Sequence, residues 1–221
     1  MYLTILIPCL NEGRTISFCI NKAKRFISRR NIDAEILVVD NGSVDDTKEV
    51  ASFLGARVIE ESNKGYGSVL RRGIIEAKGD YIIMADGDGS YDFENLEPFV
   101  DNFEKGYDFV CGNRFSGYIE KGAMPFSHKI GAPFLSFCAR IKHRVPVHDF
   151  HCGLRGFKTA IAKSMEFNST GMEFATELIF KFKDYSMTEV PIVLYKDKRE
   201  GKPHLRTIRD GFRHLRYIFK N

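Results

Sequence analysis

Two carboxylates separated by one glycine are the sharpest chemical feature of the sequence: Asp86-Gly87-Asp88, followed by Gly89. Carboxylate oxygens placed one residue apart on a turn can reach the same divalent cation. Mg²⁺ and Mn²⁺ are hard ions that prefer such ligands and often bridge to diphosphate oxygens. The glycines let the backbone approach a ligand closely. We therefore predict a metal site at Asp86 and Asp88, the alternative being an ordinary turn after a strand.

Polar residues also follow two other apolar runs. They are Pro8, Asn11 and Glu12 after the first run, and Asp40 and Gly42 after the second. The Asp40 carboxylate could accept hydrogen bonds from a base or ribose, or could act only in a turn. Glu12 could instead support a helix start through the macrodipole. Ligands bind beyond the carboxyl ends of strands in open parallel sheets, so we expect all these residues at one sheet edge.

A short glycine-containing loop, Asn63–Gly67, precedes a predicted helix and resembles a phosphate-facing loop, with Lys64 and Gly65 nearest the ligand. The Walker A motif is absent. So is G-x-G-x-x-G, because Leu70 stands where its third glycine would be. These absences weaken the nucleoside-triphosphatase and dehydrogenase interpretations.

The elements that must position these residues alternate between strand and helix. The predicted strands are continuous apolar runs, which indicates burial on both faces in a mostly parallel sheet. Helical segments of ordinary length separate them, as in βαβ units. The sequence therefore predicts an α/β fold, a Rossmann-like, mostly parallel sheet flanked by helices. The strands are predicted at 2–7, 35–39, 56–59, 81–85 and 109–111, and the helices at 15–27, 45–54, 68–77 and 95–105.

The second half of the chain has a less regular pattern. Its predicted elements are a glycine-rich loop at 114–131, a short helix at 133–141, a strand at 153–157, a helix at 173–183, a strand at 188–194, a charged segment at 196–206 and a helix at 207–219. Two stretches, 127–144 and 207–220, interleave basic and apolar residues. Each could lie on an anionic membrane, or pack on the domain with a solvated basic face.

Length and composition limit the alternatives. The 221 residues suit one domain, or one domain with a small appendage, and the net charge of +4 permits anionic partners without requiring nucleic acid. Five scattered cysteines contain no C-x-x-C pair, so we expect free thiols in a reducing cytoplasm and no zinc site. No signal peptide is apparent, and no run reaches the roughly 18 apolar residues that span a bilayer.

Five segments in this order resemble the family 2 glycosyltransferases of GT-A fold. The closest likeness is to the polyprenyl-phosphate sugar transferases of the dolichol-phosphate mannosyltransferase type. The segments are IPCLNE (7–12), VVDNGSVDDT (38–47), NKGYGSVLRRG (63–73), ADGDGSYD (85–92) and DFHCGLRGF (149–157), with weaker likeness in EVPIVLY (189–195) and REGKPHL (199–205). The likeness covers nearly the whole chain.

The resemblance implies a role for each candidate residue. Nucleotide-binding residues would be Pro8, Asn11, Glu12, Asp40, Gly42, Lys64, Gly65, Asp86 and Gly87, and catalytic residues would be Asp88, Arg114, Asp149 and Arg155. Asp88 would be the more direct ligand of Mg²⁺ or Mn²⁺. Arg114 would face phosphate, and Asp149 and Arg155 would lie near the acceptor. The family's phosphate-binding lysine would be replaced by Lys202 or His204.

The resemblance also implies a reaction. A hexose would pass with inversion from a UDP- or GDP-linked donor to a polyprenyl (dolichyl or undecaprenyl) phosphate at the cytoplasmic membrane face. A phosphate acceptor is already ionised, whereas a glycan hydroxyl would need a general base, for which Asp149 is the first candidate and Glu173 and Glu177 are weaker ones. The alternatives are transfer to such a glycan in cell-surface polysaccharide synthesis, and a non-catalytic nucleotide- or nucleic-acid-binding domain. The acidic cluster argues against nucleic acid.

These expectations divide the chain into three parts. Residues 1–205 would form the GT-A domain, with a nucleotide-sugar-binding half at 1–113 and an irregular acceptor half at 114–205. Residues 206–221 would form a basic amphipathic helix.

Overall fold

The computed structural model describes residues 1–199 and 217–219, and its centre is a seven-stranded sheet. The strand order is β3-β2-β1-β4-β6-β5-β7, and all neighbouring pairs are parallel except the two that involve β6. The predicted α/β class with a mostly parallel sheet is therefore confirmed. The strands are β1 (Leu3–Cys9), β2 (Ala34–Asp40), β3 (Arg57–Glu60), β4 (Tyr81–Met84), β5 (Phe109–Ile119), β6 (Arg155–Lys158) and β7 (Met187–Leu194).

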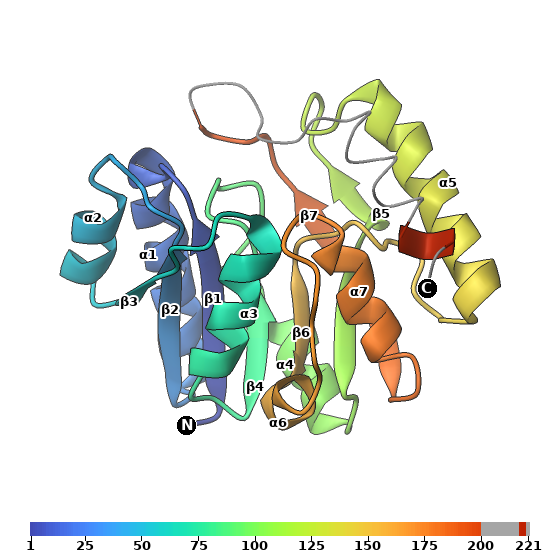
Figure 1. Ribbon diagram of the computed structural model, residues 1–221. Helices are drawn as coiled ribbons and strands as arrows, with labels where there is room; N and C mark the ends of the chain where they lie inside the picture. Colours follow the sequence, from blue (N-terminus) through green and yellow to red (C-terminus); the bar gives the residue numbers. More distant parts are fainter. Residues whose placement is uncertain (200–216, 220–221) are drawn as a thin grey trace.

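Helices cover both faces of this sheet (Figure 1). In that view α3, α6 and α7 lie in front of the strands, α1 and α4 lie behind them, and α5 stands apart beside the β5 end of the sheet. Ion pairs from Arg29 to Glu97 and from Arg30 to Asp101 join the two rear helices. The helices are α1 (Gly13–Arg30), α2 (Thr47–Phe53), α3 (Tyr66–Glu76), α4 (Glu97–Glu104), α5 (Phe126–His143), α6 (Thr159–Lys163) and α7 (Phe174–Lys181).

The core lies where the continuous apolar strands meet these helices. Leu3, Ile5, Leu6 and Ile7 of β1 are all fully buried, which the central position of β1 between β2 and β4 requires. All five cysteines are free, as expected. None of the helices among residues 1–199 and 217–219 has the length and apolar character needed to cross a membrane.

The prediction of a loop over 114–131 is wrong at both ends. Strand β5 continues to Ile119, because β7 pairs with it beyond an irregularity between Asn113 and Tyr118. This extension is largely solvent-exposed, so it lacks the apolar pattern of a strand. Gly117 suggests a loop in the sequence, but a Cβ there would lie 1.9 Å from the Ile192 carbonyl oxygen, so the glycine serves a close approach of two strands.

Helix α5 is twice as long as the helix predicted at 133–141. It begins at Phe126 and carries Pro133 in its interior, where proline usually marks a helix start. The short α6 was not predicted. The predicted helix at 207–219 falls mostly outside the described residues, of which 217–219 are helical.

The two predicted halves share one sheet. Strand β6, from the acceptor half, lies between β4 and β5 and pairs antiparallel with both. Residue 113 therefore lies within strand β5 and does not separate two cores.

The start of α3 is held against the backbone of residues 169–170. Gly67 donates its N–H to the Thr170 carbonyl (2.9 Å), and a Cβ at Gly67 would lie 2.3 Å from the Ser169 carbonyl oxygen. Gly65, at φ 128°, makes the same kind of approach to Thr170. The glycines of this loop are thus required by contact with the acceptor half of the chain.

Gly67→Ala should lower the free energy of unfolding by about 1–3 kcal/mol, because the new methyl group forces backbone to move. Gly131→Ala is the matched control, since Gly131 also lies in a helix and nothing stands within 4 Å of its Cβ position. It should stabilise by about 0.5–1 kcal/mol. Urea denaturation of both variants measures the difference, and equal stabilisation by both would contradict the packing argument.

Candidate active site

A cavity of about 340 Å³ opens at the carboxyl edge of β1 and β4. Seven predicted site residues line it: Pro8, Glu12, Lys64, Gly65, Asp86, Gly87 and Asp88. The other lining residues are Cys9, Leu10, Asn41, Tyr66, Val69, Met172 and Arg199. The loops after β1 and β4 meet here because these two strands are parallel neighbours, so their carboxyl ends lie at the same edge of the sheet, where ligands bind in open α/β folds.

The two carboxylates of the Asp86-Gly87-Asp88 turn have different surroundings. Asp88 is buried, and its Oδ1 accepts hydrogen bonds from the Ser90 N–H (2.9 Å) and hydroxyl (2.6 Å), which leaves Oδ2 facing the cavity side. Burial and, to a smaller degree, the neighbouring Asp88 charge raise the pKa of Asp86 to about 6, against the opposing effect of a hydrogen bond with Tyr66. The turn therefore gathers more negative charge than its surroundings readily stabilise.

Glu12 adds a third acidic group to this cavity. It is buried at the start of α1, its N–H donates to Thr47 Oγ1 (2.8 Å), and its carboxylate accepts a hydrogen bond from Thr15 Oγ1 (3.0 Å). Burial raises the pKa of Glu12 to about 7, and the Arg199 charge opposes that shift. The carboxylate thus titrates near neutral pH.

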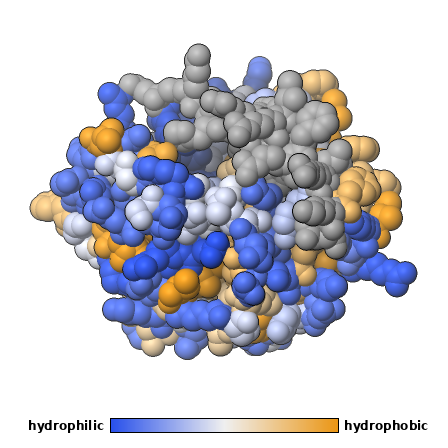
Figure 2. Space-filling view, viewed as in Figure 1, coloured by the Kyte–Doolittle hydropathy of each residue, from blue (hydrophilic) through white to orange (hydrophobic). Residues whose placement is uncertain are grey.

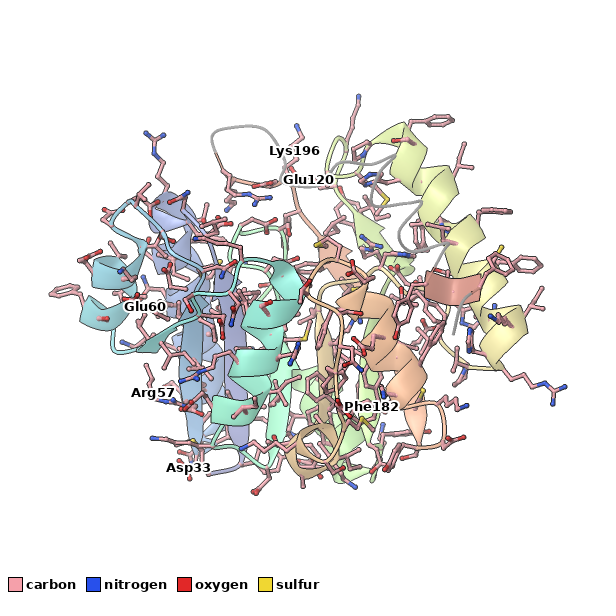
Figure 3. All side chains as sticks on the ribbon, in the orientation of Figure 1. Asp33, Arg57, Glu60, Glu120, Phe182 and Lys196 are labelled. Carbon is pink, nitrogen blue, oxygen red and sulfur yellow. The ribbon has the colours of Figure 1, made fainter. Side chains whose placement is uncertain are left out.

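The Arg199 guanidinium bridges the two acidic segments. Nη1 lies 3.2 Å from Glu12 Oε1, and Nη2 lies 3.3 Å from Asp88 Oδ2. The segment that carries it runs over the site from β7: the Lys196 N–H donates to Glu120 (2.8 Å; Figure 3), and the Lys198 N–H donates to the Asp88 carbonyl (3.0 Å). Arg199 was not predicted, although it opens the REGKPHL segment. The residues chosen there, Lys202 and His204, lie outside the described residues.

The loop after β2 is organised by Asp40 and Asn41. Asp40 is fully buried; its Oδ2 accepts the N–H groups of Gly42 (2.8 Å) and Ser43 (2.9 Å), while its Oδ1 is buried without a hydrogen-bond partner among the described residues. The Asn41 carbonyl accepts a hydrogen bond from Lys64 Nζ (2.5 Å), and a Cβ at Gly42 would collide with that ammonium group. Asp40 and Gly42 therefore fix the conformation of the loop after β2, although neither residue lines the cavity among the described residues.

Asn11 also serves loop geometry. Its Oδ1 accepts the N–H of Val44 (2.9 Å), and its own N–H donates to the Ser43 hydroxyl (2.8 Å). These two bonds join the loops after β1 and β2. Asn11 does not line the cavity among the described residues.

Arg114 and Asp149, both predicted to lie near the acceptor or its phosphate, form a separate ion pair. The guanidinium donates to both carboxylate oxygens, from Nε to Oδ2 and from Nη2 to Oδ1 (each 2.7 Å), and the Arg114 N–H donates to Oδ2 (3.1 Å). Asp149 is fully buried, and Arg114 is nearly so. Glu189 of β7 supports the pair: its Oε1 accepts the N–H of Asp149 (3.1 Å), and its Oε2 contacts His148 Nδ1 (2.7 Å). Glu189 was not predicted, because only the parallel pairing of β5 with β7 brings it here.

Arg155 lies in the interior, away from the cavity surface. It is fully buried, and its guanidinium donates to the backbone carbonyls of Cys152 (2.7 Å), Phe150 (2.6 Å) and Ala175 (2.5 Å). This geometry makes it a clamp for the 149–155 segment. That segment also meets the acidic turn, since a Cβ at Gly153 would lie 2.6 Å from Asp86 Oδ2.

Glu177 and Glu173, the other two candidates for a general base, differ in their contacts. Glu177 is buried and accepts the N–H groups of Asn168 (2.9 Å) and Ser169 (2.8 Å), so it holds the loop before α7. Glu173 precedes α7 and accepts the N–H of Gly171 (3.3 Å).

The family model for glycosyl transferase family 2 matches residues 4–165. The chain belongs to this family. It is 37% identical over 223 residues to a low-salt glycan biosynthesis hexosyltransferase of Haloferax volcanii, covering 99% of this chain and 53% of that protein, so the chain spans about half of that relative's length. It is 31% identical to a dolichyl-phosphate hexose transferase of the same organism, covering 86% of this chain and 81% of that protein.

A dolichol-phosphate mannosyltransferase of Pyrococcus furiosus is 26% identical, with all of this chain and 63% of that protein covered. Among solved structures, glucosyl-3-phosphoglycerate synthase from Mycobacterium tuberculosis, in complex with Mn²⁺, UDP and glucosyl-3-phosphoglycerate, superposes with a TM-score of 0.75 at 20% identity. That match covers 98% of this chain and 79% of the other. This likeness establishes the GT-A fold.

For a family 2 glycosyltransferase, the acidic turn has the donor chemistry that Mg²⁺ or Mn²⁺ requires. No cluster of three or more His, Cys, Asp or Glu able to hold a metal occurs within 1–199 and 217–219. Among the described residues, the acidic turn itself offers two carboxylates, Asp86 and Asp88. That number suits an ion that takes its remaining ligands from water and diphosphate.

The raised pKa of Glu12 predicts a pH-dependent stability. The folded protein holds this proton up to about pH 7, whereas an unfolded glutamate loses it near 4.5, so the Glu12 contribution to the free energy of unfolding falls as pH rises between these values. Glu12→Gln should therefore gain stability relative to wild type between pH 5 and 7.5, in thermal melts without metal.

Glu94→Gln is the control for that measurement. The hydrogen bond from Arg25 lowers the pKa of Glu94, which moves its titration away from this range, so its difference from wild type should change much less with pH than that of Glu12→Gln. If the stability difference between Glu12→Gln and wild type also stayed constant with pH, the raised pKa of Glu12 would be contradicted.

Proposed function

We propose that this protein transfers a hexose, with inversion at the anomeric carbon, from a UDP- or GDP-linked donor to a polyprenyl phosphate at the inner face of the membrane. The observation that carries the proposal is the cavity where Asp86 and Asp88 face Arg199 and Lys64. A diphosphate needs both a carboxylate-bound cation and basic side chains around it. The family match supports the same reaction class.

Asp40 is suited to bind the nucleobase. Its buried Oδ1 lacks a partner among the described residues, and a buried carboxylate oxygen is costly to leave without a hydrogen bond. Asp40 is fully buried and does not line the cavity among the described residues, so a movement of the loop after β2 would be needed for an N–H group on the edge of a uracil or guanine ring to supply that bond. Pro8, Asn11 and Gly42 would shape the surrounding loops.

The leaving nucleoside diphosphate develops negative charge as the glycosidic bond breaks, and preorganised cations stabilise such charge strongly. Lys64 and Arg199 line the cavity that would hold it. Mg²⁺ or Mn²⁺, when bound to Asp86 and Asp88, would supply further positive charge. The neighbours crystallised with Mn²⁺ or Mg²⁺ and UDP support this expectation.

The acceptor side favours a group that is already ionised. The general base predicted for a hydroxyl acceptor, Asp149, has both oxygens bound to Arg114. Glu177 likewise has both oxygens bound to backbone N–H groups. A phosphate acceptor needs no base, and the dolichyl-phosphate relatives support a lipid phosphate. Asp149 would then position Arg114, and Arg155 would position the Asp149 segment; Lys202 and His204 stay predicted acceptor contacts.

The test of this function begins with a thermal-shift panel of UDP, GDP, CDP and dTDP, each with Mn²⁺, Mg²⁺ or EDTA. A ligand at 100 times its Kd should add about 2.7 kcal/mol. The sugar donor with the stabilising base is then incubated with undecaprenyl or dolichyl phosphate, or with a free oligosaccharide. We expect labelled sugar on the lipid phosphate. Transfer to the oligosaccharide alone, or no nucleotide binding, would refute the proposal.

Asp88→Asn should reduce transfer by at least about 100-fold, since it removes charge from the turn that holds the diphosphate. Glu94→Gln, an acidic residue paired with Arg25 at the surface, should leave transfer unchanged. Near-normal turnover by Asp88→Asn would exclude the metal assignment.

Arg199→Gln should strengthen Mn²⁺ binding in the absence of nucleotide several-fold, because the guanidinium lies 3.3 Å from the oxygen that a metal would use. Titration followed by the Mn²⁺ resonance measures this without turnover. Lys198→Gln is the control for net charge, since its ammonium group stacks on Phe18 at 3.5 Å. Equal strengthening by both variants would show that only the overall charge matters.

A further inference from the structure

Helix α5 carries a row of large apolar side chains that are mostly exposed and that do not pack into the core formed by the described residues. Its members are spaced by four, four, three and four residues, which places them on one helical face. They are Phe126 (77% exposed), Ile130 (59%), Phe134 (59%), Phe137 (58%) and Ile141 (65%). Figure 2 shows hydrophobic side chains gathered along the side of the molecule where α5 runs in Figure 1. Together they expose on the order of 500 Å² of apolar surface, a size that marks an interaction site.

The inner face of α5 does not need these side chains for packing. Small residues, Ser136 and Ala139, are the ones it buries, and the Ser136 hydroxyl accepts the N–H of Phe150 (3.1 Å). His143 stacks on Phe180 of α7 with ring centroids 3.6 Å apart. The helix is therefore attached through small and polar contacts while its large apolar face stays outside.

The charge around this face indicates the kind of partner. Residues 121–148 contain no Asp or Glu, although the chain has 29, and they contain five basic residues: Lys121, Lys129, Arg140, Lys142 and Arg144. Of these, Lys129, Lys142 and Arg144 are exposed on α5 or at its end. A second copy of the chain would bring the same positive charge against this one, which opposes association. An anionic lipid surface offers opposite charge and an apolar interior.

The position of α5 in the chain connects this face to the acceptor side of the site. The strand before the helix carries Arg114, and the segment after it carries Asp149, which pairs with Arg114. A bilayer that held α5 would therefore hold both ends of this pair near its surface.

We propose that α5 lies in the interface of an anionic bilayer, with Phe126, Ile130, Phe134, Phe137 and Ile141 inserted and the basic residues at the headgroups. Docking brings a lipid acceptor close to the site, and this role of the docking rests on the proposed function. The binding itself requires neither donor nor acceptor.

The test is vesicle flotation of the full chain without nucleotide. Wild type should bind vesicles of phosphatidylcholine with 30% phosphatidylglycerol, bind pure phosphatidylcholine more weakly, and lose binding as salt rises. Phe134→Glu with Phe137→Glu should reduce the partition coefficient at least about 10-fold, because two charges would enter the apolar layer. Phe53→Glu is the matched control, since Phe53 is 90% exposed on α2 at the far end of the sheet, and it should bind as wild type does.

Two measurements keep the outcomes distinct. Circular dichroism and the nucleotide thermal shift should be the same for the double variant and wild type, so a loss of flotation cannot be assigned to misfolding. Absent binding by wild type, equal binding by the double variant, or a wild-type dimer that the double variant converts to monomer would overturn the proposal. Flotation that persists when sugar transfer to lipid phosphate fails would refute the function and leave the docking surface intact.

Discussion

Buried carboxylates dominate the site. Glu12, Asp86 and Asp88 come from two loops that the parallel sheet brings to one edge, and burial raises the pKa of both Glu12 and Asp86. Arg199, delivered by the chain as it leaves β7, offsets part of this charge while it is also paired with Asp197. The surrounding hydrogen bonds, from Ser90 to Asp88 and from Thr15 to Glu12, hold the acids in place against their repulsion. A site arranged in this way is ready to exchange one cation for another.

The negative charge of Asp149 is compensated in a different way from the charges of Asp86 and Asp88. The Arg114 guanidinium neutralises it within the protein, in a fork geometry that fixes the planar group. Glu189 then orders the backbone that carries Asp149. The cavity around Asp86 and Asp88 therefore keeps an excess of acidic groups, whereas Arg114 and Asp149 form a neutral, preorganised pair. Under the proposed function, the first region would bind a cation and the second would position Arg114.

Much of this could be predicted from the sequence where the signal is local. The apolar strands and the acidic turn are each contained in a few consecutive residues. The α/β fold could therefore be predicted, and so could the position of Glu12, Asp86 and Asp88 at one edge of the sheet. Arg199 could not be predicted in the same way, because its role depends on the return of the chain from the opposite end of the sheet. Motif likeness placed Arg155 near the acceptor, but only coordinates reveal its three carbonyl partners. For α5, periodicity gives the apolar row but not the direction in which it faces.

The contact between Gly65, Gly67 and the backbone at Ser169–Thr170 has an evolutionary consequence. At these two glycines the loop that lines the cavity meets the backbone of residues 169–170, with no space there for a side chain between the two main chains. A new acceptor preference acquired by recombination could not replace residues after 113 freely, because any incoming segment must present the same backbone path to these two glycines. Strand β6, paired with β4, imposes a second condition of the same kind. Specificity in this chain can therefore diverge by substitution within each half more readily than by exchange of halves.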